Sequence, residues 1–170
     1  VAGACSGDST DPVDPVDPTV ASFADAFGGT TIDGDTFTFP SGAEGWAGFA
    51  NMNTDLYPLS FSEAGTITFN GSVPSDASVD VRFRLEFQPH PAVDPAFDAA
   101  TITVSGADAA SYSVAIPSQG ANTFSSLIMY VVTQDEAVVI TDVVVAAGNG
   151  STDPVDPEEP EAPTVVTLAV

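Results

Sequence analysis

The two arginines of this chain stand two positions apart in one short segment, and the sequence contains no lysine. In that segment, VDVRFRLEFQ at residues 79–88, polar and apolar side chains alternate. Because successive side chains of a β-strand point to opposite faces, the polar residues share one stripe. The stripe consists of Asp80, Arg82, Arg84, Glu86 and Gln88. Guanidinium, carboxylate and amide groups can donate to and accept from sugar hydroxyls, so Arg82, Arg84, Glu86 and Gln88 are candidate glycan ligands.

An ordinary solvent-facing strand explains the same stripe. In that case each arginine–carboxylate pair would contribute at most about 1 kcal/mol to stability. The restriction of both cations to one stripe favours the binding interpretation. Residues on the same face of a strand lie roughly 6.5–7 Å apart, so the stripe could span a short oligosaccharide.

Aromatic and amide side chains nearby in the sequence are further ligand candidates. Trp46, the single tryptophan, is either a stacking platform for the apolar face of a sugar or a core residue. Asn51, Asn53 and Tyr57 follow it closely and can hydrogen-bond a sugar. His90 lies between two prolines, which favour an extended loop, where it either contacts the ligand or is simply exposed.

Four carboxylates are candidates for a metal site. They are Asp33, Asp35, Glu44 and Asp142. Asp142 interrupts an otherwise apolar final strand, where a carboxylate is costly to bury unless it is paired or bound to a metal. The first and last strands of a sandwich often lie close together, and calcium takes about six to eight oxygen ligands. The acids therefore predict either a structural calcium ion or, for Asp142, an exposed strand face.

The sequence favours a protein without catalytic activity. It contains no GxSxG elbow, HExxH, P-loop or dinucleotide-binding fingerprint. With 24 acidic residues, chance pairs of carboxylates are expected, so a glycosidase pair has no specific support.

The net charge of −22 excludes several partners. Sequence-independent binding of nucleic acid needs several cations on phosphates, and anionic membrane surfaces repel such a chain. No apolar run reaches the roughly 18 residues of a membrane span. The charge suits salty surroundings, in which repulsion is screened, or it simply maintains solubility. A hydrophobic content of 44% indicates one folded core rather than an acidic disordered chain.

Short runs rich in Val, Ile, Thr and Phe alternate with Gly, Pro, Asn and Asp clusters across the middle of the chain. The predicted strands are Thr36–Phe39, Thr66–Asn70, Val79–Gln88, Thr101–Val104, Tyr112–Ile116, Leu127–Thr133 and Ala137–Val145. Asn70-Gly71 predicts a tight turn after the second of them. No segment keeps a helical period, so the sequence predicts an all-β fold, an antiparallel β-sandwich or jelly roll.

The two ends differ from the middle in composition. Residues 11–18 read DPVDPVDP and residues 153–157 read DPVDP. Repeated Asp-Pro and Glu-Pro favour extended, self-repelling linkers. The predicted organisation is an acidic linker at 1–20, a β-sandwich at 21–148, and a second linker with the start of a following segment at 149–170. We therefore expect the chain to be part of a larger multidomain protein.

Cys5 is the single cysteine, which excludes a disulfide within the chain. The segment VAGACSG around it resembles a bacterial lipobox, in which the cysteine is lipidated. Cys5 is thus either a lipid anchor of an outer-membrane lipoprotein or an incidental free thiol, and no membrane insertion is expected.

The stretch from Phe37 to Val145 resembles jelly-roll carbohydrate-binding modules appended to laminarinase-type β-1,3-glucanases of marine bacteria. The segments that carry the resemblance are GWAGFANMN (45–53), GTITFNGSVP (65–74), VRFRLEF (81–87), PHPAVDPAFD (89–98) and ASYSVAIPSQGANTFSSLIMYV (110–131). A looser resemblance, to jelly-roll modules with a structural calcium, rests on Gly45-Trp46 and Asp142. Many such modules carry several exposed aromatics on the binding face, whereas this chain has one tryptophan.

Together the residues and the resemblance predict a secreted or surface-tethered module that binds a polysaccharide, a β-glucan such as laminarin, without catalysis. The alternative is a structural or adhesive bead, or a subunit of an extracellular stalk or filament. The β-prone tail Thr164–Val170 suits that alternative, because a loose strand can add to the sheet edge of a neighbour.

Overall fold

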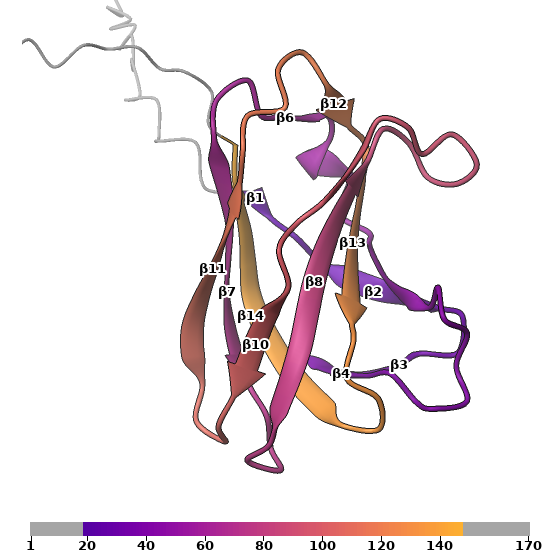
Figure 1. Cartoon of the computed structure of the whole chain (residues 1–170), viewed down its shortest axis with the longest axis vertical. Helices are drawn as coiled ribbons and strands as arrows, with labels where there is room; N and C mark the ends of the chain where they lie inside the picture. Colours follow the sequence, from indigo (N-terminus) through magenta and orange to yellow (C-terminus); the bar gives the residue numbers. More distant parts are fainter. Residues whose placement is uncertain (1–18, 148–170) are drawn as a thin grey trace, which may run out of the picture.

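A computed structural model describes residues 19–147, which form a two-layered, all-β sandwich (Figure 1). The predicted antiparallel β-sandwich is therefore confirmed. Cys5, the linker at 149–170 and all but the last two residues of the linker at 1–20 lie outside the described residues. Within residues 19–147, no helix has the length and hydropathy of a membrane span.

The first sheet, called the β7 sheet here, has the strand order β11-β7-β14-β4-β3, and β1 also pairs with β14. Every pairing in it is antiparallel. Its strands are β1 (Thr19–Val20), β3 (Thr31–Asp33), β4 (Thr36–Thr38), β7 (Gly65–Ser72), β11 (Ala110–Ile116) and β14 (Ala137–Ala146).

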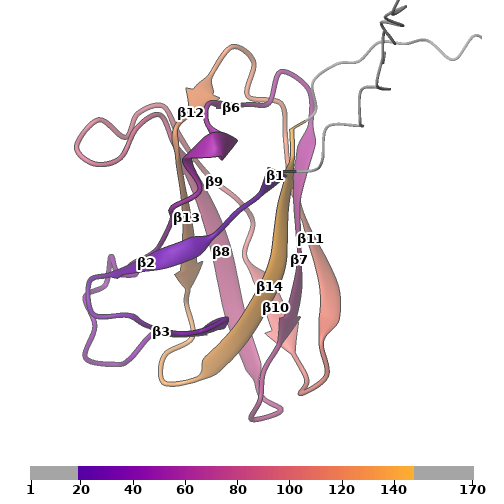
Figure 2. The ribbon, with the colours of Figure 1, turned by 180° about the vertical axis from the view of Figure 1, so that it is seen from behind.

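The second sheet, called the β8 sheet here, has the order β10-β8-β13-β5-β2, and β9 also pairs with β8. Its strands are β2 (Phe23–Phe27), β5 (Gly48–Asn51), β8 (Ser78–Glu86), β9 (Ala96–Asp98), β10 (Ile102–Ser105) and β13 (Ser126–Val131). A small third pair joins β6 (Leu59–Ser60) to β12 (Thr123–Phe124), and a short 3-10 helix, η1, spans Thr54–Leu56. Figures 1 and 2 show β2 and β3 at the same side of the sandwich.

The core lies between the two sheets and follows from the alternation along each strand. On β8, Val79, Val81, Phe83 and Leu85 are at most 1% exposed. The Phe83 ring meets that of Phe69, from β7, edge-on at a centroid distance of 5.6 Å. Burying each such side chain contributes about 1.5–3 kcal/mol. The inward set of β8 thus fixes which of its residues face outward.

The seven strands predicted from the sequence correspond to β4, β7, β8, β10, β11, β13 and β14. The other strands are short, between two and five residues, and each lies next to glycine, proline or polar residues. Because a run that short carries too few alternating positions to stand out, the sequence did not predict them.

The turn predicted at Asn70-Gly71 is wrong. Both residues lie inside β7, where Gly71 pairs with Ala110 on one side and with Ile140 on the other. A Cβ atom at Gly71 would lie 2.9 Å from Cγ1 of Val104, a residue of the opposite sheet. This glycine therefore permits close packing between the sheets, and the chain turns later, where Asp76 N–H donates to Val73 O.

Candidate ligand-binding cleft

A cleft of about 1030 Å³ lies on the outer face of the β8 sheet. Three strands supply its floor, because the register places Arg84 opposite Ile128, and Ile128 opposite Ala50. The remaining lining residues come from β2, from the loop before β5, from the segment 52–57, from the loop between β8 and β9, and from Ser125 just before β13. The residues that line the cleft include Asp25, Phe27, Trp46, Asn51, Tyr57, Arg84, Glu86, His90, Ser126 and Tyr130.

An aromatic row forms one side of this cleft. Trp46 is 62% exposed, and its ring stacks on that of Phe27 at a centroid distance of 6.2 Å and an angle of 10°. Between Phe27 and Tyr130 stands Gly48, where a Cβ atom would lie 3.0 Å from the Phe27 ring and 2.9 Å from the Tyr130 ring. The absence of a side chain at Gly48 therefore lets the two rings approach. The sequence left open whether Trp46 stacks or packs in the core, and the structure places it at the surface.

A cluster of two arginines and two carboxylates lies beside the aromatic row. Arg84 Nε–H donates to Glu86 Oε1 over 2.8 Å, and Arg84 Nη1 donates to Asp98 Oδ2 over 2.5 Å. Asp98 is the register partner of Arg84 across β8 and β9. Arg82 Nη1 lies 3.6 Å from Asp98 Oδ1, and its guanidinium carbon lies 5.0 Å from the centre of the Tyr130 ring. Asp98 thus joins both arginines.

Glu86 is the most buried member of this cluster, with 7% of its side chain exposed. A carboxylate at that depth is costly unless it is paired and hydrogen-bonded. Arg84 pairs with it, and Ser126 Oγ donates to its Oε2 over 3.4 Å. The hydrogen bond to Glu86 is also the main cause that raises the pKa of Arg84. Three residues of the polar stripe, Arg82, Arg84 and Glu86, are therefore connected through Asp98 and one another rather than separately solvated.

The predicted ligands Asn51, Asn53 and Tyr57 all make hydrogen bonds within the protein. Asn51 accepts from Ser22 N–H and donates to the Tyr57 hydroxyl, while Asn53 Oδ1 accepts from Asp55 N–H at the start of η1. The Tyr57 hydroxyl also accepts from Leu127 N–H over 2.8 Å. Burial raises the pKa of Tyr57. Asn51 and Tyr57 also line the cleft, so these hydrogen bonds hold two side chains of its wall in place.

The last two predicted ligands lie after the end of β8. His90 is exposed and lines the cleft from the loop between β8 and β9. Gln88 is exposed in the same loop and is not among the lining residues. The expected alternation also fails there, since Phe87 is 38% exposed and its N–H donates to Val93 O and Pro95 O instead of continuing the strand.

Among the residues of the cleft and its rim that sequence reasoning missed are Asp25, Phe27, Asp98 and Tyr130. Tyr130 could have been predicted from the sequence, because it lies between the buried positions 129 and 131 of the predicted strand 127–133. Phe27 and Asp98 lie on β2 and β9, which were not predicted. The approach of Asp98 to the arginines and of Phe27 to Gly48 depends on strand pairing, which one sequence does not show.

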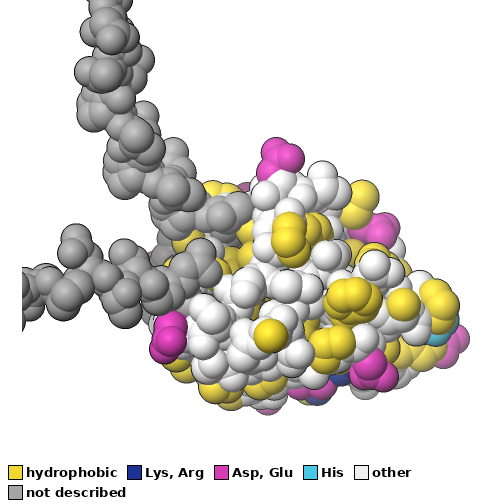
Figure 3. Space-filling model, turned by 90° about the horizontal axis from the view of Figure 1, so that it is seen from above, with side chains coloured by type: hydrophobic (Ala, Val, Ile, Leu, Met, Phe, Trp, Pro, Cys, Tyr) yellow, Lys and Arg dark blue, Asp and Glu magenta, His cyan; other side chains and the backbone are white. Residues whose placement is uncertain are grey.

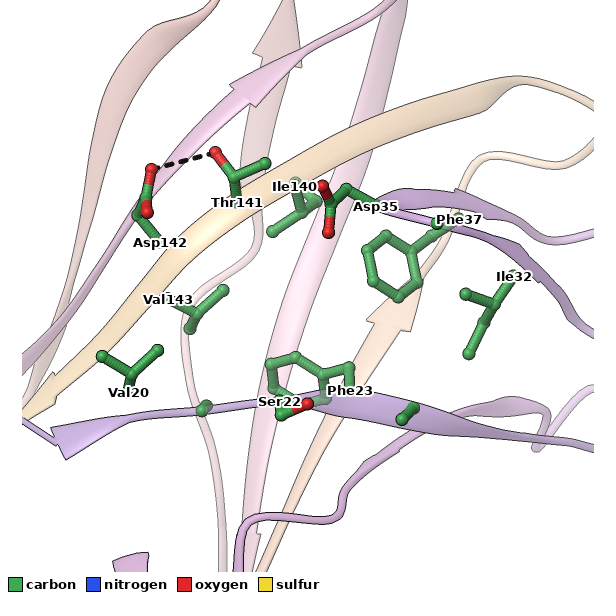
Figure 4. A pocket seen from close by; sticks show the side chains of 13 residues that line it. Val20, Ser22, Phe23, Ile32, Asp35, Phe37, Ile140, Thr141, Asp142 and Val143 are labelled. Atoms are coloured by element: carbon green, nitrogen blue, oxygen red, sulfur yellow. Dashed lines mark hydrogen bonds between the residues drawn. The ribbon is translucent and has the colours of Figure 1, made fainter.

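The four carboxylates proposed for calcium are not brought together. Within residues 19–147, no three His, Cys, Asp or Glu side chains gather closely enough to hold a metal ion. Asp35 and Asp142 line one groove of about 640 Å³ between β1, β2, β4 and β14, and Figure 4 shows Thr141 and Ile140 between them. Asp142 is exposed at a β-bulge and accepts from Asn70 and Thr141. The four side chains therefore do not form a calcium site together.

The end of the sandwich that carries the β6–β12 pair shows mostly hydrophobic and uncharged polar side chains (Figure 3). Its acidic side chains are separate from one another. Aromatic rings and charged groups meet on the outer face of the β8 sheet. Such a surface suits a ligand with a flat apolar face and hydroxyl groups at its edge.

The fold is similar to those of carbohydrate-binding modules of known structure. The tandem CBM22-1–CBM22-2 domain of Paenibacillus barcinonensis Xyn10C matches with a TM-score of 0.50 and 16% identity, over 76% of this chain and 43% of that chain. A family 29 carbohydrate-binding module from Piromyces equi matches with a TM-score of 0.48 and 12% identity, over 77% of this chain and 88% of that chain. No protein-family model and no curated protein sequence matches the chain.

Proposed function

We propose that this chain is a non-catalytic carbohydrate-binding module whose ligand lies in the cleft on the β8 sheet. The observation that carries the proposal is the exposed Trp46, stacked on Phe27 beside the arginine–carboxylate cluster. A ring that is 62% exposed leaves apolar area in water, and covering that area with a sugar ring is favourable. The fold similarity to the CBM22 tandem of P. barcinonensis agrees with this function.

The ligand we propose is a β-glucan such as laminarin. The cleft volume of about 1030 Å³ lies at the upper end of the range for small-molecule sites, which supports a ligand of more than one sugar unit. Its aromatic row supplies stacking, and Arg84, Glu86 and Asp98 supply donors and acceptors beside it. The proposed setting is extracellular or at the cell surface, within a larger protein that acts on polysaccharide.

A panel of polysaccharides tests this function. The intact chain is run in native gels that contain laminarin, xylan or a soluble cellulose derivative, with an empty gel as the control. Retardation by at least one of them supports glycan binding, and retardation by laminarin supports the β-glucan assignment. No retardation by any neutral polysaccharide would contradict the proposal. New reducing ends after incubation would show an enzyme instead.

The alternative function predicted from the sequence is a structural or adhesive bead. The C-terminal segment Thr164–Val170, which suits that alternative, lies outside the described residues. Light scattering separates the two functions. A monomer that gains thermal stability with a soluble glucan supports binding. A polymer that grows with concentration and ignores glucan supports the structural role.

A further inference from the structure

We propose that Glu86 and Asp98 are specificity residues that neutralise the two arginines, so that the cleft selects uncharged glycans and rejects uronates and sulfated sugars. The inference rests on the proposed function and concerns the chemical class of ligand. It assigns Asp98, which the sequence did not indicate, a role in recognition.

The geometry pairs the cations before any ligand arrives. Arg84 is held between two carboxylates, with contacts of 2.8 Å to Glu86 and 2.5 Å to Asp98. Arg82 lies 3.6 Å from Asp98, and the Tyr130 ring covers its guanidinium group. A sulfate or carboxylate that approaches therefore meets cations that are already neutralised, and it lies beside two carboxylates that repel it.

The charges around the cluster oppose an anion as well. Two arginines and two carboxylates cancel formally, and Asp25 adds a negative charge from β2 on another part of the lining. The chain has no further Lys or Arg, and its net charge is −22. A polyanion therefore meets repulsion in the cleft and around it, most strongly at low salt.

A neutral hydroxyl group fits the same cluster without displacing anything. It can accept from a guanidinium N–H of Arg84 and donate to a carboxylate oxygen of Asp98, because a hydroxyl does both. The Arg84 side chain is 24% exposed and that of Asp98 is 41% exposed, so both can be reached from solvent. The pair recognises a polar group without requiring that it be charged.

Removing the two carboxylates should expose the arginines to anions. The double variant Glu86→Gln, Asp98→Asn keeps the shape of both side chains and removes their charges. The matched control is Glu63→Gln, Asp108→Asn, which changes the net charge equally at two exposed positions outside the cleft. Binding of alginate oligosaccharide, a polyuronate, and of laminarin oligosaccharide is measured by calorimetry at low salt, using the full chain.

We expect the wild type and the control to bind no alginate, and the double variant to gain about tenfold or more in alginate affinity, as a charge-assisted hydrogen bond would give. Alginate binding by the wild type, or no gain in the double variant, would overturn the inference. Circular dichroism checks that the double variant is folded, and the single variant Asp98→Asn, which keeps the buried Glu86, repeats the test. The laminarin titration reports separately on the proposed function.

Discussion

On the outer face of the β7 sheet the side chains are short and mostly uncharged, whereas on the outer face of the β8 sheet they are large, aromatic or paired ions. The first face presents Thr36, Thr38, Thr66, Thr68, Asn70, Ser111 and Ser113. Both faces obey the same alternation along their strands. The difference shows that alternation decides which residues point outward, while side-chain size and the surrounding loops decide whether an outer face can hold a ligand.

Replacing the exposed ring should have the largest effect on binding. For Trp46→Ala we expect laminarin affinity to fall roughly thirtyfold, about 2 kcal/mol, because a central aromatic contact is lost. Thr68→Ala, on the outer face of the β7 sheet, should leave the affinity unchanged. Equal affinities for the two variants in calorimetry would place the ligand elsewhere.

Removing a hydrogen-bonding side chain should cost more stability on the outer face of the β8 sheet, where the side chain is a buried charge, than on that of the β7 sheet. Glu86→Ala leaves Arg84 with Asp98 alone and should lower the free energy of unfolding by about 1–3 kcal/mol. Asn70→Ala, which removes two exposed hydrogen bonds on the other face, should cost no more than about 1 kcal/mol. Urea unfolding of both variants measures the two losses of free energy. A larger loss for Asn70→Ala than for Glu86→Ala would contradict this difference between the faces.

Alkaline pH should weaken the cleft wall through Tyr57. Burial raises the pKa of its phenol above the ordinary value of about 10. Since the folded state then binds the proton more tightly, its contribution is fully present below about pH 10 and is lost as the pH rises through the higher folded-state pKa. The melting temperature of the wild type should therefore fall more steeply with pH above about pH 10. Tyr57→Phe should be less stable than the wild type at neutral pH, yet its melting temperature should fall less steeply above about pH 10. An identical slope in the two proteins would contradict a role of the Tyr57 phenol in this decline.

Chelation should have the smallest effect. Asp35 and Asp142 share a groove, yet no three metal-ligating side chains of residues 19–147 gather around it. Adding a chelator to the chain in a calcium-containing buffer should leave its melting temperature unchanged. A clear fall would support the calcium site expected from the sequence.

Long alternating strands could be predicted from the sequence, because a core face that repeats every second residue leaves a clear pattern. The segment 79–88 gave β8 and the outward placement of Arg82, Arg84 and Glu86. The same rules failed at Gly71, where a glycine serves close packing between sheets rather than a turn. They also placed the end of the strand at Gln88, whereas β8 ends two residues earlier, at Glu86, because the N–H of Phe87 bonds to a loop.

The candidate site was only partly within reach of the sequence. Trp46 and the arginines could be proposed from residue type, but the contact of Asp98 with both arginines depends on the pairing of β9 with β8. The stacking of Phe27 on Trp46 likewise joins an edge strand to a loop. Such neighbours are set by topology, which composition and spacing do not specify.

The single tryptophan makes the central claim directly measurable. Titrating laminarin oligosaccharide into the full chain while recording tryptophan emission reports on Trp46 alone, and calorimetry on the same samples reports total binding. If the glycan lies in this cleft, the emission should change saturably, with the same midpoint as the heat. Heat of binding without any change in emission would place the glycan away from this cleft and contradict the proposed site.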